Sequence, residues 1–263
     1  MKFVKMQGCG NDYVFTDTLT GPARDWAALA VGISDRHFGV GSDGIIVIGP
    51  GETGDFRMDI WNADGSRAEM CGNGIRCCAK YVYDRGLTEK TELVFDTLAG
   101  PRPVRLTVEN GTVRQVTVDM GKPELLETVP QQETDAGKFL RAVSMGNPHA
   151  VFLCEDPDAV PLERIGPLLE RDASFPERVN VEFVCVTGPE QFRMRVWERG
   201  SGETLACGTG ACASFAALRA AGLLGDRAEA ILRGGSLQLA MQADGHVAMT
   251  GPAVTVFVGE WPV

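Results

Sequence analysis

The sequence predicts a mixed α and β fold made of two similar lobes, in which strands outnumber helices. The main observation is an internal repeat. Shifting the chain against itself by 136 residues places residues 56–61 (FRMDIW) on 192–197 (FRMRVW). The same shift places residues 71–74 (CGNG) on 207–210 (CGTG) without a gap. A constant offset indicates two homologous halves, because insertions and deletions in surface loops normally break such a register.

The composition is that of a folded protein. The 263 residues suffice for one large domain or two ordinary ones, and 44% are hydrophobic and 23% charged, which excludes wholesale disorder. We therefore expect an N-terminal lobe at residues 1–120 and a C-terminal lobe at residues 121–252. Residues 121–137 are rich in Pro, Glu, Gln and Thr, which favours a linker and candidate hinge between the lobes.

The elements of the first half follow from its apolar periodicity. Alternation or short apolar runs predict strands at residues 2–7, 13–17, 45–48 and 56–61. Helical spacing predicts helices at residues 25–33 and 75–85, the second ended by Gly86. The Asn110-Gly111 dipeptide predicts a hairpin over residues 105–119.

The second half repeats this plan. Its expected strands lie at residues 139–144, 150–154, 180–186 and 192–197, and its expected helices at residues 162–171 and 210–221. A closing hairpin is expected to turn at Asp244-Gly245.

Charge and the N-terminal sequence exclude several classes of partner. The formal net charge of −10 repels phosphate backbones and anionic membranes, so we expect no nucleic-acid or membrane partner. The first residues contain no apolar stretch typical of a signal peptide, and no run of 18 apolar residues occurs in the chain. We therefore expect a cytoplasmic protein.

Eight cysteines and three histidines raise the question of metals and disulfides. A cytoplasmic chain keeps its thiols reduced, so structural disulfides are not expected. No two cysteines have Cys-x-x-Cys spacing and the histidines lie far apart, so we expect no metal site. The sequence also contains no motif for a lysine that binds pyridoxal phosphate and no thiamine-type motif, so we expect no organic cofactor.

Two cysteines stand out because they occupy equivalent positions in the repeat. Cys71 and Cys207 each precede a Gly-x-Gly turn at the start of a predicted helix. The free N–H groups there favour negative charge, so we expect the thiol pKa to fall from about 8.5 and the turn to hold an anion. The alternative, that each is a small buried hydrophobic residue, is less favoured because packing alone would accept alanine. The other six cysteines are interpreted as structural.

Two equivalent and opposed thiols suit the inversion of a stereocentre that carries hydrogen. One thiolate removes the proton from one face of the carbon while the other thiol returns a proton to the opposite face. Backbone N–H groups of Gly72, Asn73, Gly208 and Thr209 could stabilise the substrate carboxylate during this transfer. The expected partner is thus a small amino acid, around which we expect the lobes to close.

Six motifs resemble those of the diaminopimelate epimerase family, and the match runs over nearly the whole chain in the family's order. They lie at residues 8–13 (GCGNDY), 61–66 (WNADGS), 70–77 (MCGNGIRC), 145–149 (MGNPH), 178–181 (RVNV) and 198–210 (ERGSGETLACGTG). The resemblance implies a homodimeric enzyme, independent of pyridoxal phosphate, that interconverts LL- and meso-diaminopimelate for lysine and peptidoglycan synthesis. It also implies two pseudo-symmetric lobes, each a central helix wrapped by a mostly antiparallel curved sheet. A last strand, residues 253–263, would return to the first lobe.

The resemblance assigns roles to further residues. It implies that Asn62, Asn180 and Arg199 hold the distal, unreactive end of the substrate. Asn11, Asn147 and Glu198 would lie about the reacting end, and His149 and Glu198 would set the protonation of the cysteines. The chain departs from many members at Gly44, where they carry glutamine, so the contact of that glutamine is unassigned here.

The residues alone leave some of these roles open. Asn11 and Asn147 are repeat mates, but each could be a turn asparagine beside a glycine. Asn62 lies in a turn sequence, and its mate is Glu198, which breaks the symmetry as a substrate with two unlike ends requires. Arg199 suits a bidentate carboxylate contact but also a solvated surface charge. His149 is more often a structural histidine.

Two rival functions stay open at this point. Proline racemase and hydroxyproline epimerase share the Cys-Gly-x-Gly and Cys-Gly-Thr-Gly turns, although they typically carry histidine where this chain has Asn73. A thiol switch, in which Cys71 and Cys207 form a reversible disulfide, is the rival from another class.

Overall fold

The chain divides into two compact units. A computed structural model describes residues 1–131 and 133–262. Unit 1 comprises Met1–Val118 and Gly251–Val263, and unit 2 comprises Asp119–Thr250. No helix within the described residues is long and apolar enough to cross a membrane.

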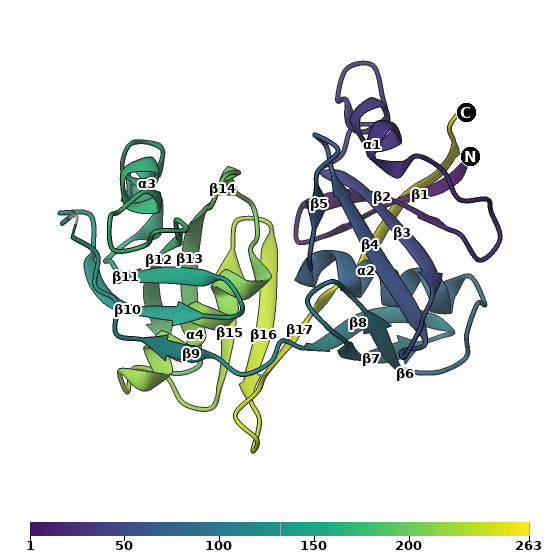
Figure 1. Cartoon of the computed structure of the whole chain (residues 1–263). Helices are drawn as coiled ribbons and strands as arrows, with labels where there is room; N and C mark the ends of the chain where they lie inside the picture. The colour runs from purple at the N-terminus through teal and green to yellow at the C-terminus, as the bar shows by residue number, and fades with distance from the viewer. Residues whose placement is uncertain (132, 263) are drawn as a thin grey trace. The chain divides into compact units, whose positions relative to one another are not determined.

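Unit 1 is a sheet in which antiparallel pairs predominate (Figure 1). The paired strands are, in spatial order, β18 (Val254–Glu260), β1 (Lys2–Gly8), β2 (Asn11–Asp17), β3 (Gly44–Pro50), β4 (Phe56–Asn62), β6 (Glu92–Asp96), β7 (Arg102–Glu109) and β8 (Thr112–Asp119). A short strand, β5 (Arg67–Ala68), pairs with β4. Only the β2–β3 and β4–β6 pairs in this series are parallel.

Two helices pack on this sheet. Helix α2 (Gly72–Asp84) contacts β1, β2 and β7, and all its residues from Gly72 to Val82 are buried, as a helix enclosed by its own sheet requires. Helix α1 (Trp26–Ser34) packs against β3 and β4 through Trp26, Ala30 and Ile33, which recur at helical spacing. The side chain of Asp25 caps α1 by accepting the Ala28 N–H at 3.1 Å.

Unit 2 repeats this arrangement. Its paired strands are, in order, β9 (Glu124–Leu126), β10 (Lys138–Ser144), β11 (Pro148–Leu153), β12 (Asn180–Gly188), β13 (Gln191–Glu198), β15 (Arg227–Leu232), β16 (Gly235–Met241) and β17 (Val247–Pro252). Strand β14 (Gly202–Thr204) pairs with β13. The parallel pairs of this series are β11–β12 and β13–β15, the counterparts of those in unit 1.

The helices of unit 2 also have counterparts. Helix α4 (Gly208–Ala220) is enclosed by β10, β11, β12, β15 and β16. Helix α3 (Leu162–Glu170), preceded by the 3₁₀ turn η1 (Pro157–Ala159), packs outside against β12, β13 and β14. The bounds of α1 and α3, and those of α2 and α4, differ by the 136 residues of the sequence repeat. The predicted fold class is confirmed: mixed α and β, mostly antiparallel, with one enclosed helix in each unit.

Several local predictions need correction. Helices α2 and α4 begin at Gly72 and Gly208, two or three residues earlier than the apolar pattern indicated, because a cysteine side chain caps each one. Residues 121–137, expected as a linker, also contain the short strand β9, which pairs with β10. Strands β5, β6, β14 and β15 were not predicted.

Candidate active site

Cys71 is the N-cap of helix α2. Its extended backbone (φ −139°, ψ 113°) turns the side chain back over the first turn, where Sγ accepts the Gly74 N–H at 3.2 Å. The thiol faces Asn11 and donates to its Oδ1 at 3.2 Å. Asn11 begins strand β2 directly after Cys9 and Gly10, whose positive φ angles form the turn. The left-handed residues of this turn are therefore Cys9 and Gly10 and not Asn11, whose side-chain amide accepts a hydrogen bond from Cys71.

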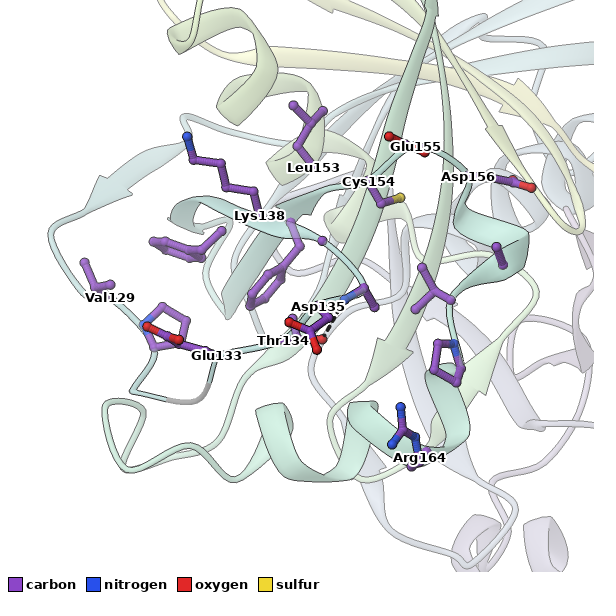
Figure 2. Close-up of a pocket in the computed structure, with 18 residues that line it drawn as sticks. Val129, Glu133, Thr134, Asp135, Lys138, Leu153, Cys154, Glu155, Asp156 and Arg164 are labelled. Carbon is purple, nitrogen blue, oxygen red and sulfur yellow. Dashed lines mark hydrogen bonds between the residues drawn. The ribbon is translucent and has the colours of Figure 1, made fainter.

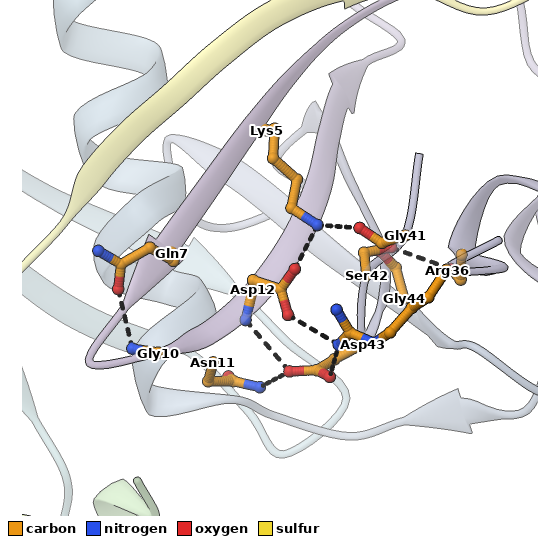
Figure 3. A network of polar contacts seen from close by, with 11 residues as sticks. Lys5, Gln7, Gly10, Asn11, Asp12, Arg36, Gly41, Ser42, Asp43 and Gly44 are labelled. Carbon is orange, nitrogen blue, oxygen red and sulfur yellow. Dashed lines mark hydrogen bonds and ion pairs between the residues drawn. The ribbon is translucent and has the colours of Figure 1, made fainter. Parts of the chain in front are cut away.

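Asp43 fixes the orientation of the Asn11 amide, as Figure 3 shows. Asp43 Oδ2 accepts from Asn11 Nδ2 at 2.7 Å, so Asn11 must present its oxygen to Cys71. The same carboxylate accepts the Asp12 N–H at 3.1 Å and is paired with Arg36 at 2.9 Å. Lys5 and Arg36 in turn pair with Asp12. A network of charged groups thus holds the side chain nearest to Cys71.

Gly44 lies beside this network, opposite Asn62 in the β3–β4 register. Its φ is +156°, and a Cβ built there would overlap the carbonyl oxygen of Trp61. The glutamine considered above for position 44 therefore does not fit this backbone. Asn62 ends β4 and donates through Nδ2 to Ser66 Oγ at 3.0 Å.

Asn73 and Gly72 form the first turn of α2 beneath Cys71. The Asn73 side chain is buried, and its Oδ1 accepts from Arg76 Nη2 at 2.9 Å. Arg76, also buried, donates to the Gly72 carbonyl at 3.2 Å. Hence the Asn73 amide is used inside unit 1, and its contribution to a ligand would come from its backbone.

Cys207 is the N-cap of α4 and has the same backbone as Cys71 (φ −121°, ψ 112°). Its Sγ accepts the Gly210 N–H at 3.4 Å and lies 3.4 Å from Thr209 Oγ1. The expectation of a lowered pKa is wrong for this thiol. Burial raises the Cys207 pKa well above its ordinary value, the nearby Glu198 and Glu182 raise it further, and the hydrogen bonds from Thr209 and Gly210 offset this only in part.

Glu198 lies at the end of β13 and is hydrogen-bonded to Cys207. The Thr204 hydroxyl also donates to Glu198 Oε1 at 2.5 Å. Burial raises the pKa of the Glu198 carboxyl, although these hydrogen bonds and the nearby His149 act in the opposite direction. The pKa values of both Glu198 and Cys207 are therefore raised, which favours the protonated form of each group.

His149 joins the same part of unit 2. It is fully buried on β11, and its Nδ1 lies 2.6 Å from Glu182 Oε1 on the parallel strand β12. Its Nε2 lies 3.1 Å from Asn147 Oδ1. Asn147, like its repeat mate Asn11, has an amide oriented by a polar partner.

Asn180 and Arg199 contact each other through a backbone group. Asn180 Oδ1 accepts the Arg199 N–H at 3.0 Å, while its Nδ2 donates to the Pro148 carbonyl at 2.9 Å. The Arg199 guanidinium is exposed and donates to the Glu177 carbonyl at 3.0 Å.

The predicted residues thus form two groups. In unit 1 the structure brings Asn11 to Cys71, with Gly72 and Asn73 in the following turn; in unit 2 it brings Glu198 and Thr209 to Cys207, with His149 beside Asn147. Sequence reasoning missed Asp43 and Glu182. A charged residue inside the apolar run of residues 180–184 (NVEFV) was the available signal for Glu182.

A separate hollow in unit 2 contains none of these residues. It is lined by residues between 129 and 139 and between 152 and 164, as Figure 2 shows. Its polar groups include Glu133, Asp135, Lys138, Asp156 and Arg164. The cysteine in its wall is Cys154, whose pKa is raised to about 12 by burial and by Cys185 and Asp156. We therefore place the candidate chemistry at Cys71 and Cys207.

Comparison with known proteins agrees with the sequence motifs. The family model described as diaminopimelate epimerase matches residues 3–126 and 141–256. The chain is 50% identical over 262 residues to the diaminopimelate epimerase of Bacteroides thetaiotaomicron, covering 99% of this chain and 97% of that protein. It is 47% identical over 274 residues to the diaminopimelate epimerase of Methanococcus maripaludis strain C5, covering 99% of both.

Solved structures of low sequence identity share the fold. A phenazine biosynthesis protein of the PhzF family from Bacillus anthracis superposes with a TM-score of 0.79 at 17% identity, covering 100% of this chain and 99% of that one. A hydroxyproline epimerase from Agrobacterium vitis superposes with a TM-score of 0.74 at 17% identity, covering 98% and 91%. Both show the fold alone, whereas the family match and the curated relatives cover nearly the full length. The chain belongs to the diaminopimelate epimerase family.

Proposed function

We propose that this chain interconverts LL- and meso-diaminopimelate by exchanging the proton of one α-carbon between Cys71 and Cys207. The observation that supports this most is the matched pair of caps: a thiol accepts the N–H of the third residue of an enclosed helix in each unit. Identities of 47–50% with diaminopimelate epimerases support the substrate. The product would serve lysine and peptidoglycan synthesis.

The two thiols would begin the reaction in different protonation states. Cys207 is buried beside Glu198 and Glu182, so it starts as a thiol and acts as the acid. Cys71, whose thiol donates to Asn11 Oδ1 in the structure, must first lose that proton to solvent. As the thiolate it then takes the α-proton, and the C–H electron pair stays on carbon. Cys207 delivers its proton to the opposite face, which leaves Cys71 as thiol and Cys207 as thiolate for the reverse reaction.

The carbanion requires stabilisation that the chain itself can supply. The backbone N–H groups of Gly72, Asn73, Gly208 and Thr209 stand in the first turns of α2 and α4, where N–H groups lack an acceptor within the helix and, together with the helix dipole, favour a carboxylate. We assign no organic cofactor to this step.

The unlike ends of the substrate would be recognised by unlike residues. We assign the distal ammonium and carboxylate to Asn62, Asn180 and Arg199, of which Arg199 carries the exposed guanidinium suited to a carboxylate. We assign the reacting amino-acid end to Asn11, Asn147 and Glu198.

Hydrogen exchange tests the proposed reaction directly. In deuterated water the protein should introduce deuterium at one α-carbon of LL-diaminopimelate and form the meso isomer, as followed by mass spectrometry and NMR. Proline offered under the same conditions should gain no deuterium. Exchange into proline instead would favour the proline racemase reaction.

Substituting each cysteine tests the roles of the two thiols. Cys71→Ser and Cys207→Ser should each lose at least about 10³-fold in epimerisation, because a serine hydroxyl ionises far less readily than a thiol. Oxidation that links the two cysteines should abolish turnover. Full turnover in both serine variants, with binding of a partner still controlled by oxidation, would favour the thiol switch.

We further propose that the enzyme is a homodimer formed through strand β18. Val254, Val256, Phe257 and Val258 are exposed on this strand, on both faces of the sheet, which is unusual for apolar side chains of a monomer. Sedimentation should give twice the chain mass for the native protein. Val256→Asp combined with Val258→Lys should give a monomer; a native monomer would contradict the proposal.

A further inference from the structure

Glu182 is a fully buried acid at the centre of unit 2. Neither it nor His149 is exposed to solvent, and Glu182 Oε1 lies 2.6 Å from His149 Nδ1. Among the described residues, His149 is the ion-pair partner of Glu182, and Glu182 Oε2 has no hydrogen-bond partner. Burying a carboxylate with one oxygen unpaired costs stability, so its presence requires a reason other than packing.

The repeat shows that folding does not need an acid at this position. The residue equivalent to Glu182 in unit 1 is Ile46, which is also fully buried. Both lie against the glycine of the enclosed helix: a Cβ on Gly74 would come within 2.5 Å of Ile46 Cδ1, and one on Gly210 within 2.7 Å of Glu182 Oε1. Unit 1 therefore fills this site with a hydrocarbon, whereas unit 2 places a carboxylate there.

The carboxylate determines which way two other side chains face. Because a carboxylate only accepts, the Glu182 contact places the hydrogen on His149 Nδ1. In the ion pair with Glu182 the imidazole carries a hydrogen on both ring nitrogens, so His149 Nε2 also donates, to Asn147 Oδ1 at 3.1 Å, and this bond turns the Asn147 amide nitrogen away from the imidazole. In unit 1, by contrast, Asp43 binds the nitrogen of Asn11 and leaves the oxygen facing Cys71. The two repeat-mate asparagines are thus held in opposite orientations: Asn11 is held through its amide nitrogen and Asn147 through its amide oxygen.

We propose that Glu182 is a positioning residue of the epimerisation reaction: it fixes the imidazole of His149 and, through His149, presents the Asn147 amide nitrogen to the substrate as a donor. The proposal rests on the proposed function above. The same charge favours the thiol form of Cys207, consistent with the raised pKa of that thiol.

Two substitutions separate positioning from packing. Glu182→Ile copies the repeat-mate residue and should fold, with a melting temperature below that of the native protein because the buried His149 Nδ1 loses its acceptor. Its kcat/KM for LL-diaminopimelate should fall about 100-fold, as misplacement of a binding group by about 1 Å would cause. Glu182→Gln keeps a hydrogen-bonding group beside His149 and should recover part of this loss. Because Asn147 contacts substrate in this scheme, KM should rise in the isoleucine variant.

A thiolate titration gives a readout that a structural role would not move. The groups around Cys207 are Glu198 on β13, Glu182 on β12, His149 on β11 and the hydroxyl of Thr209. In both Glu182 variants the ultraviolet absorbance of the Cys207 thiolate should appear at lower pH, because a negative charge has been removed. The signal is assigned by difference from the same protein with Cys207→Ser.

A matched control and the opposite outcomes complete the test. Asp119→Asn removes the charge from a partly exposed histidine–carboxylate contact of unit 2, to His246, and should leave kcat/KM and the Cys207 titration unchanged. The proposal would be overturned if both Glu182 variants kept the native kcat/KM and the native pH of Cys207 ionisation. If the isoleucine variant fails to fold, the glutamine variant alone decides. If the native protein does not epimerise diaminopimelate, the proposed function is wrong. The Cys207 titration does not depend on that result, so the two failures can be told apart.

Discussion

At each of the two caps, a sulfur atom accepts the backbone N–H of the third residue of a helix, yet the surroundings of the two sulfur atoms differ. Cys71 meets the neutral amide oxygen of Asn11 and is partly exposed. Cys207 is buried and lies near two carboxyl groups, which raise its pKa against the influence of the helix N-terminus. Desolvation and like charge therefore outweigh the helix at Cys207. The same local sequence thus places the two thiols in different electrostatic surroundings.

The contact between Asp43 and Asn11 gives a prediction at the scale of single residues. Asp43→Ala should allow the Asn11 amide to rotate and lower kcat/KM for LL-diaminopimelate about 10- to 100-fold, because the group facing Cys71 is no longer held. Arg36→Ala is the matched control: it removes the ion pairs of an exposed side chain to Asp43 and Asp12, each worth about 0–1 kcal/mol, and leaves the Asn11 contact in place. Equal losses in the two variants would show that the ion pair, rather than the amide, matters.

At the scale of elements, the predictable features were those with a strong local signal. The Asn110-Gly111 turn has positive φ at both residues and joins β7 to β8 as predicted, and Gly86 ends α2 with φ +70°. Strands β5 and β14 have two and three residues, too few for alternation to be visible. The contacts of Asp43 and Glu182 join segments about 30 residues apart, which no local pattern encodes.

The two cysteine caps give a prediction at the scale of the helix. Cys71→Ala and Cys207→Ala should each lower the free energy of unfolding by about 1 kcal/mol, because the N–H of Gly74 or Gly210 loses its acceptor. The serine variants keep an acceptor at the same position and should unfold at nearly the native urea concentration, although they are inactive. Urea unfolding followed by circular dichroism measures this. A serine variant as unstable as its alanine counterpart would contradict the capping role.

At the scale of the whole molecule, the repeat supplies two copies of one scaffold, and some positions of the site differ between them. Ile46 corresponds to Glu182, Asn62 to Glu198, and the buried Arg76 to Cys212. The scaffold holds such polar residues because they find local partners, as Arg76 does in Asn73 and Glu182 in His149. A symmetric fold can thereby hold chemically unequal half-sites, as a substrate with two unlike ends requires.

The buried thiols of the enclosed helix α2 make the stability of the whole protein sensitive to alkali. Burial raises the pKa of Cys77 to about 12, against the opposing charge of Arg76. The unfolded thiol ionises near pH 9, so above that pH the unfolded state binds fewer protons and stability falls. The loss for Cys77 should be about 1.4 kcal/mol per pH unit between pH 9 and 12, with no loss below about pH 8. Urea unfolding at a series of pH values tests this: Cys77→Ala should be less stable at pH 7 but have a shallower alkaline slope, and equal slopes would contradict the assignment.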